Sequence, residues 1–386
     1  MERVLYIFWL CLLCVGCSPS GQTPPTEIVF ETTVTEETTE TTTIDEIASQ
    51  IDEMSLEDKV GQMLIVDVGE LDTDFVSGSF DAKVHNAGGY ILFDDDIRGV
   101  ADTQALTAKL RQISDIPPFI AVDEEGGAVS RIGRSGAVAD YSVPSARSMA
   151  ENGTVGENYA KIAKTLAAMG FNMDFAPDAD VDTNPDNPII GSRAFSTDAQ
   201  TAGENVVIAM NALRDNGVIP VVKHFPGHGD TATDSHVGTA VLRHDRQRLD
   251  SVELVPFKKA IENGAEVIMV GHIKVPALSD SDRPATLDPD IITGLLRGEL
   301  GYDGVVVTDA MNMGAVTVYG MEDSIKYAVD AGADMLLMPP DTGKAYDALL
   351  AMAENGDISR DRIDESVYRI LKLKKKLRRD NRRDNK

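Results

Sequence analysis

Eight short apolar runs, separated by stretches of helical periodicity, constrain the fold of this 386-residue chain more than any other feature. Such runs, rich in β-branched residues and bounded by turn residues, are typical of strands buried on both faces of a parallel sheet. They are Met63–Val68, Gly89–Phe93, Phe119–Val122, Asn172–Ala176, Ile219–Val222, Val267–Val270, Val305–Thr308 and Met335–Met338.

The stretches between most of these runs repeat apolar residues near helical spacing. Strands that alternate with helices predict a parallel sheet, and eight strands predict a closed (β/α)8 TIM-type barrel. We therefore expect one α/β domain over residues 45–375, with any site at the carboxyl ends of its strands. The predicted helices include Asp102–Ile113, Asn158–Met169, Ala202–Asn216, Ser251–Asn263 and Asp288–Glu299.

The segment from Lys223 to His236 holds three of the six histidines and two aspartates. It follows the predicted strand Ile219–Val222, so Lys223 and His224 are expected at the end of that strand and the rest in a loop. Charged side chains delivered from a strand into a loop indicate a functional site.

A metal site is the first interpretation of this segment to test, because His224 and His228 have the spacing of a zinc-binding helix. Pro226 and Gly227 lie between them and do not suit a helix interior, and no cysteine lies nearby to complete a structural site. We favour a carboxylate and imidazole pair that donates and recovers a proton near neutral pH, and expect neither a metal nor a cofactor. This pair is Asp234 and His236.

The whole segment resembles the signature loop of bacterial β-N-acetylglucosaminidases of glycoside hydrolase family three. The resemblance implies that His236 is the general acid/base and that Asp234 is its partner. A second match is Asp309, which ends the predicted strand Val305–Thr308 and resembles the nucleophile of the family. Taken alone, an aspartate at a strand end could equally cap the next helix.

Two further segments match the family and, together with Lys223 and His224, supply expected contacts to the sugar hydroxyls. Ala128 departs from the family pattern, which often has an arginine at that point after Gly126-Gly127. Carboxylates and guanidinium groups suit vicinal hydroxyls, since they offer acceptors and a fork of donors. The residues that the resemblance assigns to substrate binding are Asp123, Arg131, Arg193, Lys223 and His224.

The resemblance implies a retaining exo-β-N-acetylglucosaminidase that removes terminal N-acetylglucosamine from peptidoglycan fragments or muropeptides through a covalent glycosyl-aspartate. Two other reactions on the same scaffold stay open: a β-N-acetylglucosaminide phosphorylase and a β-glucosidase. A membrane-tethered sugar-binding lipoprotein is the alternative of a different class.

The amino-terminal sequence predicts where the protein works. Val4–Leu13 is apolar but too short to span a bilayer, and with the cysteines that follow it looks like a bacterial lipoprotein signal over residues 1–16. Cys17 would carry the lipid, although an ordinary secretory signal remains the alternative. Residues 17–44 are rich in threonine and glutamate and predict a disordered tether that holds the domain outside the cell membrane.

Charge and cysteine content exclude other classes. The formal charge of −27 argues against a nucleic-acid partner, despite the basic tail at residues 376–386. All three cysteines lie in the leader, so the predicted barrel can form no internal disulfide bond.

Overall fold

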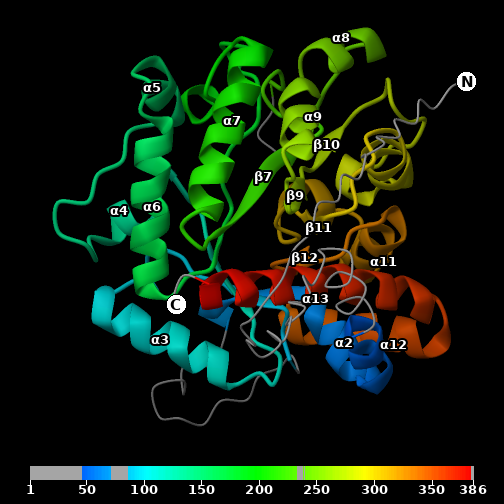
Figure 1. Ribbon diagram of the computed structural model, residues 1–386. Helices are drawn as coiled ribbons and strands as arrows, with labels where there is room; N and C mark the ends of the chain where they lie inside the picture. Colours follow the sequence, from blue (N-terminus) through cyan, green and yellow to red (C-terminus); the bar gives the residue numbers. More distant parts are fainter. Residues whose placement is uncertain (1–45, 71–85, 233–237, 239, 384–386) are drawn as a thin grey trace, which may run out of the picture. The chain divides into compact units, whose positions relative to one another are not determined.

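A barrel of eight parallel strands forms the centre of the computed structural model (Figure 1). The structure describes residues 46–70, 86–232, 238 and 240–383. Each barrel strand overlaps one predicted apolar run, so the prediction of a (β/α)8 fold is confirmed. The strands, in order around the barrel, are β1 (Leu64–Asp67), β2 (Gly89–Ile91), β3 (Phe119–Val122), β6 (Met173–Asp174), β7 (Ile219–Phe225), β9 (Val267–Val270), β11 (Val305–Thr308) and β12 (Leu336–Leu337).

The barrel closes between β11 and the start of β12. Val307 forms a parallel bridge with Met335, and the Thr308 amide donates to the Met335 carbonyl at 3.0 Å. β12 in turn pairs with β1 through Leu64 and Leu336. The first and last parts of the barrel are therefore held in one continuous sheet.

Helices surround the strands and supply the outer layer of the core (Figure 1). The longer ones are α2 (Leu56–Gln62), α3 (Val100–Gln112), α6 (Val155–Met169), α7 (Ala199–Arg214), α9 (Val255–Glu262), the π-helical segment η5 (Asp290–Glu299), α11 (Met321–Ala331), α12 (Thr342–Asn355) and α13 (Arg360–Arg383). The shorter elements are η1 (Val68–Glu70), α4 (Arg131–Ser135), α5 (Ala146–Glu151), η3 (Gly191–Arg193), α8 (Arg246–Ser251), η4 (Ala285–Leu287) and α10 (Gly314–Thr317). Two small sheets join β4 (Glu124–Gly126) to β5 (Val129–Ser130), and β8 (Ala240–Val241) to β10 (Ile273–Lys274).

Local sequence explains where the two longest early helices start and stop. The Asp198 side chain accepts from the Thr201 amide and caps the first turn of α7. Gly170 ends α6 in the left-handed conformation, which glycine adopts without a Cβ penalty. Both helices bury one apolar face against the barrel, as their spacing predicts.

The predicted helix Ser251–Asn263 is wrong as one unit, since α8 and α9 divide there. Pro256 stands in the first turn of α9, where its missing N–H is tolerated but where it cannot continue a preceding helical turn. The break falls at Val252, whose φ of −132° and ψ of −75° are not helical. The chain therefore turns at Val252 and forms two short helices instead of one long helix.

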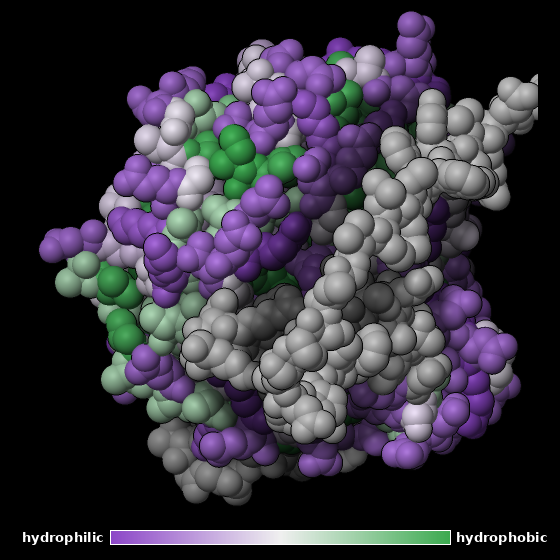
Figure 2. Space-filling view, viewed as in Figure 1, coloured by the Kyte–Doolittle hydropathy of each residue, from purple (hydrophilic) through white to green (hydrophobic). Residues whose placement is uncertain are grey.

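The described surface and helices bear on two other expectations. Hydrophilic residues dominate the face in Figure 2, in keeping with the large formal charge. Within the ranges given above, no helix combines the length and the apolar character that a membrane span needs. Cys17 and residues 17–44 lie outside the described residues.

Candidate active site

The described site residues predicted from sequence meet at the carboxyl ends of the barrel strands. Asp123 follows β3, Lys223 and His224 lie near the carboxyl end of β7, and Asp309 follows β11. Arg131 begins α4, which comes after the β4–β5 hairpin, and Arg193 ends η3. This face is where barrel enzymes place their active sites, because each strand delivers its next residue to the same rim.

Lys223 joins two carboxylates from the strand-end segment after β3. Its Nζ lies 2.7 Å from Asp123 Oδ1 and 2.6 Å from Glu125 Oε1, and the lysine side chain is only 3% exposed. Burial alone would lower the pKa of Lys223, but the two carboxylates outweigh it and hold the pKa above its ordinary value. The ammonium group is therefore charged and fixed in place.

Arg193 forms a bidentate pair with the same glutamate. Its Nε lies 2.8 Å from Glu125 Oε2 and its Nη2 lies 2.9 Å from Glu125 Oε1. Burial raises the pKa of Glu125, but Arg193 and Lys223 overcome that effect and hold the pKa below its usual range. Sequence reasoning missed Glu125. The available signal was spacing. In an extended chain, side chains two positions apart point to the same side, and Glu125 lies two positions after Asp123.

Arg131 completes the polar rim beside Asp123. Its Nη2 lies 3.4 Å from Asp123 Oδ2, and its guanidinium carbon lies 5.1 Å from the centre of the Phe93 ring. The ring and the carboxylate orient the guanidinium group. Asp123 is thus held between Lys223 and Arg131, and its own side chain remains 18% exposed at the rim.

His224 is held as a neutral imidazole. Its Nδ1 lies 2.8 Å from Asp180 Oδ2, and its Nε2 lies 3.5 Å from Arg193 Nη2. Burial first, and then the positive charge of Arg193, lower the pKa of His224 to about 4. Asp180 also accepts from the His228 amide at 2.5 Å, so one carboxylate orients both the histidine and the loop after β7. Sequence reasoning missed Asp180 as well.

Asp309 differs from the other carboxylates, since among the described residues it forms no ion pair. Its Oδ1 accepts from the Ala310 amide at 2.8 Å. Burial raises the pKa of Asp309, but the imidazoles of His272 and His224 outweigh burial and place the pKa below its ordinary value. The carboxylate is ionised at neutral pH without a lysine or arginine that blocks it, as a nucleophile requires.

His272 positions the turn that carries Asp309. Its Nδ1 lies 2.8 Å from Thr286 Oγ1 and its Nε2 lies 2.9 Å from the Ala310 carbonyl oxygen. This fully buried histidine follows β9 and was not predicted from sequence. The available signal was a histidine two positions after a predicted apolar run, as with His224 after Val222.

A cation at this rim would have to compete with Arg193. One ligand atom each of Asp178, Asp180 and His224 lies within 4.8 Å of the others. However, Arg193 Nη2 lies 3.7 Å from Asp178 Oδ2 and near His224 Nε2, so a guanidinium group already supplies positive charge there. Asp234 and His236, the predicted acid/base pair, lie outside the described residues.

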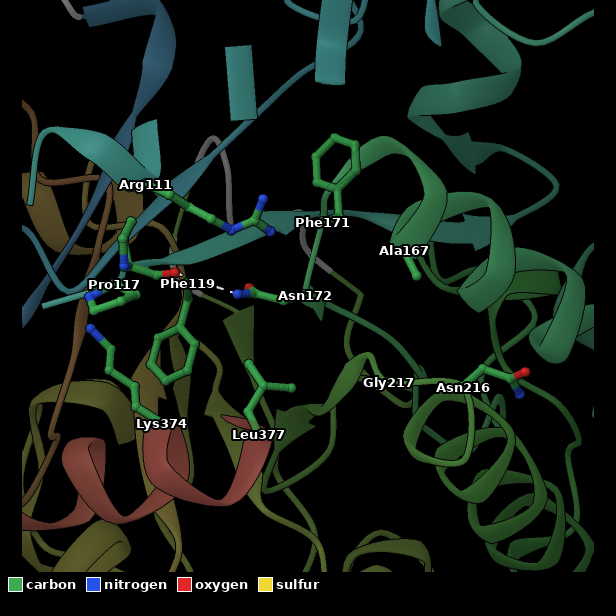
Figure 3. Close-up of a pocket in the computed structure, with 11 residues that line it drawn as sticks. Arg111, Pro117, Phe119, Ala167, Phe171, Asn172, Asn216, Gly217, Lys374 and Leu377 are labelled. Carbon is green, nitrogen blue, oxygen red and sulfur yellow. Dashed lines mark hydrogen bonds between the residues drawn. The ribbon is translucent and has the colours of Figure 1, made fainter. Parts of the chain in front are cut away.

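A separate pocket of about 310 Å³ lies at the amino-terminal end of the strands (Figure 3). Arg111 and Lys374 line it beside Phe119, Phe171 and other residues around the starts of β3, β6 and β7. None of the predicted site residues lines this pocket. In barrels this end serves stability more than chemistry, so it is not the active-site candidate.

The fold and the rim together define a (β/α)8 protein whose site offers paired charges to a polar ligand. Residues 55–373 match the Glycosyl hydrolase family 3 N terminal domain. The chain belongs to glycosyl hydrolase family 3, and the family resemblance drawn from the motifs is confirmed.

Similar proteins agree with this assignment. "Beta-hexosaminidase A" of Pseudoalteromonas piscicida is 36% identical over 331 residues, which are 76% of this chain and 54% of that protein. "Beta-hexosaminidase LpqI" of Mycobacterium tuberculosis is 33% identical over 340 residues, 83% of each chain. The structure of a family 3 β-N-acetylglucosaminidase from a Paenibacillus species has a TM-score of 0.79 and 39% identity, and the match covers 84% of this chain and 63% of that one. The chain thus spans less than two thirds of the Pseudoalteromonas and Paenibacillus proteins.

Proposed function

We propose that this protein is a retaining exo-β-N-acetylglucosaminidase. The observation that carries the proposal is an ionised Asp309, which has no ion pair among the described residues and lies on the same barrel rim as the cluster of Asp123, Glu125, Arg193 and Lys223. Relatives named β-hexosaminidase and β-N-acetylglucosaminidase support the sugar class.

In the proposed reaction, Asp309 attacks the anomeric carbon and forms a glycosyl-enzyme ester. His236, oriented by Asp234, gives its proton to the leaving oxygen as the glycosidic bond breaks. The neutral imidazole then takes a proton from water, which attacks the ester and releases the sugar with its original configuration. A histidine in this role replaces the second carboxylate that most retaining glycosidases use.

The charged rim holds the sugar for this attack. The free edges of Asp123 and Arg131 and the fixed cations of Arg193 and Lys223 would bind the ring hydroxyls, and neutral His224 would act as a further hydrogen-bonding group. Because Glu125 and Asp180 already fix these groups, little reorganisation is needed when substrate binds.

For the cellular role, we infer trimming of N-acetylglucosamine from peptidoglycan fragments outside the membrane, with Cys17 as the lipid attachment point. The leader sequence and the Thr/Glu-rich residues 17–44 support this location. The proposed organisation is one catalytic domain over residues 45–375 followed by a basic tail at residues 376–386.

The test is nitrophenol release from nitrophenyl β-N-acetylglucosaminide by the wild-type protein, Asp309→Ala and His236→Ala. We expect turnover that is independent of phosphate, lost in Asp309→Ala and reduced roughly a hundredfold or more in His236→Ala. Dependence on phosphate would identify a phosphorylase instead, and preference for the glucoside would identify a β-glucosidase. Sugar binding without turnover would favour a binding protein.

A further inference from the structure

Described residues on the two sides of the segment that carries Asp234 and His236 meet in one polar cluster. Asp230 precedes the segment and His244 follows it, 14 positions later. His244 Nε2 lies 2.8 Å from Asp230 Oδ2, so a direct hydrogen bond joins the two sides. Nothing in the reaction described above uses either side chain.

Two more residues converge on the same carboxylate oxygen. Thr183 Oγ1 donates to Asp230 Oδ2 at 2.8 Å, and Arg248 Nη2 lies 3.3 Å from that oxygen and 3.1 Å from Thr183 Oγ1. Arg248, in α8, is itself anchored, because its Nε donates at 3.3 Å to Glu253, whose side chain is 1% exposed. We call Thr183, Asp230, His244 and Arg248 the clasp.

The chain on each side of the clasp is fixed to the barrel. Before it, a Cβ added at Gly229 would lie 2.0 Å from the Val181 carbonyl oxygen, and Asn187 Nδ2 donates to the Gly229 carbonyl at 3.1 Å. After it, β8 pairs with β10, and the Leu242 amide donates to the Lys274 carbonyl at 2.9 Å. The clasp therefore links two anchored backbone segments and not two loose ones.

A cation site is the alternative use of this cluster, since ligand atoms of Asp230, His244 and Glu253 lie within 4.8 Å of one another. Arg248 already contacts both carboxylates, at 3.3 and 3.2 Å, and supplies the positive charge that a metal would bring. Ordinary surface pairing is the second alternative. The side chains of Asp230, His244 and Arg248 are 21%, 33% and 34% exposed, and pairs so exposed contribute little to stability.

We propose that the clasp is a positioning device for the general acid/base, and that His244 and Asp230 are its central residues. This inference rests on the proposed function of His236. Proton transfer needs the imidazole within hydrogen-bonding reach of the glycosidic oxygen, and a small misplacement is costly to the rate. The clasp joins residues 230 and 244, and so holds together the described backbone from which residue 236 has to reach the glycosidic oxygen.

The test compares wild type, His244→Ala and His244→Gln on phenyl and dinitrophenyl β-N-acetylglucosaminides. Phenol is a poor leaving group and needs the acid, whereas dinitrophenol leaves without it. We expect kcat/KM on the phenyl substrate to fall roughly tenfold to a hundredfold in His244→Ala, with a much smaller fall in kcat/KM on the dinitrophenyl substrate, because kcat/KM reports the step in which the leaving group departs. His244→Gln, which keeps a donor near the position of Nε2, should recover most of the loss.

Arg246→Ala is the matched control, since Arg246 lies in α8 with Arg248 but pairs with Glu299 and Asp250 and not with the clasp. It should leave kcat/KM on both substrates unchanged. Equal losses of kcat/KM on both substrates in His244→Ala, or no loss on either, would overturn the proposal. An inactive wild type would instead refute the proposed function, so the two failures are distinguishable.

Discussion

At the scale of single residues, the rim is a set of buried charges that neutralise one another. Lys223 and Arg193 share Glu125, and Lys223 also pairs with Asp123, so no cation is buried alone. Asp309 is the exception, since among the described residues no cation pairs with it and its Oδ1 accepts from the Ala310 amide. This asymmetry separates the groups that hold a sugar from the one that would attack it.

Glu124, which follows Asp123 and begins β4, predicts a pH-dependent stability. Burial raises the pKa of Glu124 to about 7, although Ser130, Tyr141 and the Ile132 amide all donate to its carboxyl group. The folded protein therefore binds the proton more tightly than the unfolded chain. The resulting stabilisation is complete below the unfolded value of 4.5 and is lost as pH rises through about 7.

Glu124→Gln removes this titration while it keeps hydrogen-bonding atoms in place. Between about pH 4.5 and about pH 8, the free energy of unfolding of wild type should fall by roughly 2–3 kcal/mol relative to the variant. Urea unfolding at both pH values measures this difference. A stability difference between the two proteins that does not change with pH would contradict the explanation.

The sequence predicted the described site residues at the carboxyl ends of strands, because the end of an apolar run shows where a buried strand meets the loop that follows it. Asp123, Lys223, His224 and Asp309 were found in this way. The partners of these residues were not. Lys223 and Asp123 are 100 positions apart, and only the barrel brings them together. Glu125, Asp180 and His272 act through such distant contacts. Spacing near strand ends could have pointed to Glu125 and His272, but not to the partners that they meet.

At the scale of elements, the loop after β7 depends on close backbone packing. Gly229 accepts no side chain, because a Cβ there would lie 2.0 Å from the Val181 carbonyl oxygen and 2.5 Å from its carbonyl carbon. The two segments therefore lie in direct backbone contact, next to Asp180 and the clasp. The predicted helix is divided at Val252 although its apolar periodicity continues, because Pro256 cannot extend a preceding helical turn.

Gly229→Ala should displace this loop from the segment at Val181. We expect a loss of about 1–3 kcal/mol in unfolding free energy, with a larger proportional loss of turnover than of folded protein. Gly156→Ala in α6 is the control, because its Cβ would meet only Ile208, at an ordinary 3.4 Å, and alanine favours helix. Urea unfolding and turnover assays on both variants check this, and equal behaviour of the two would refute it.

At the scale of the whole molecule, a buried carboxylate holds the barrel seam. Asp334 is fully buried and precedes β12, where it accepts from the Val306 amide at 2.9 Å. It also pairs with Arg297 of η5 at 2.7 Å and with Arg369 of α13 at 3.2 Å. One side chain thus connects β11, the start of β12 and two outer helices at the point where the sheet closes.

Asp334→Asn should lower the free energy of unfolding by about 3–5 kcal/mol, because it leaves buried guanidinium groups without their carboxylate. Asp303→Asn is the control, since Asp303 is 80% exposed and its pairs with Arg369 and Lys372 are 3.8 and 3.9 Å long. It should change stability by less than about 0.5 kcal/mol. Urea unfolding measures both, and a mild effect in Asp334→Asn would show that the seam does not depend on this carboxylate.

The central claim is that Asp309 forms a covalent bond to the sugar. The most direct test is to treat the protein with a fluorinated N-acetylglucosaminyl fluoride, which forms the glycosyl-enzyme quickly and releases it slowly, and to map the modified peptide by mass spectrometry. The account predicts one sugar per protein, attached to Asp309 and absent in Asp309→Ala. A label on another carboxylate, or no label on a protein that turns over substrate, would contradict it.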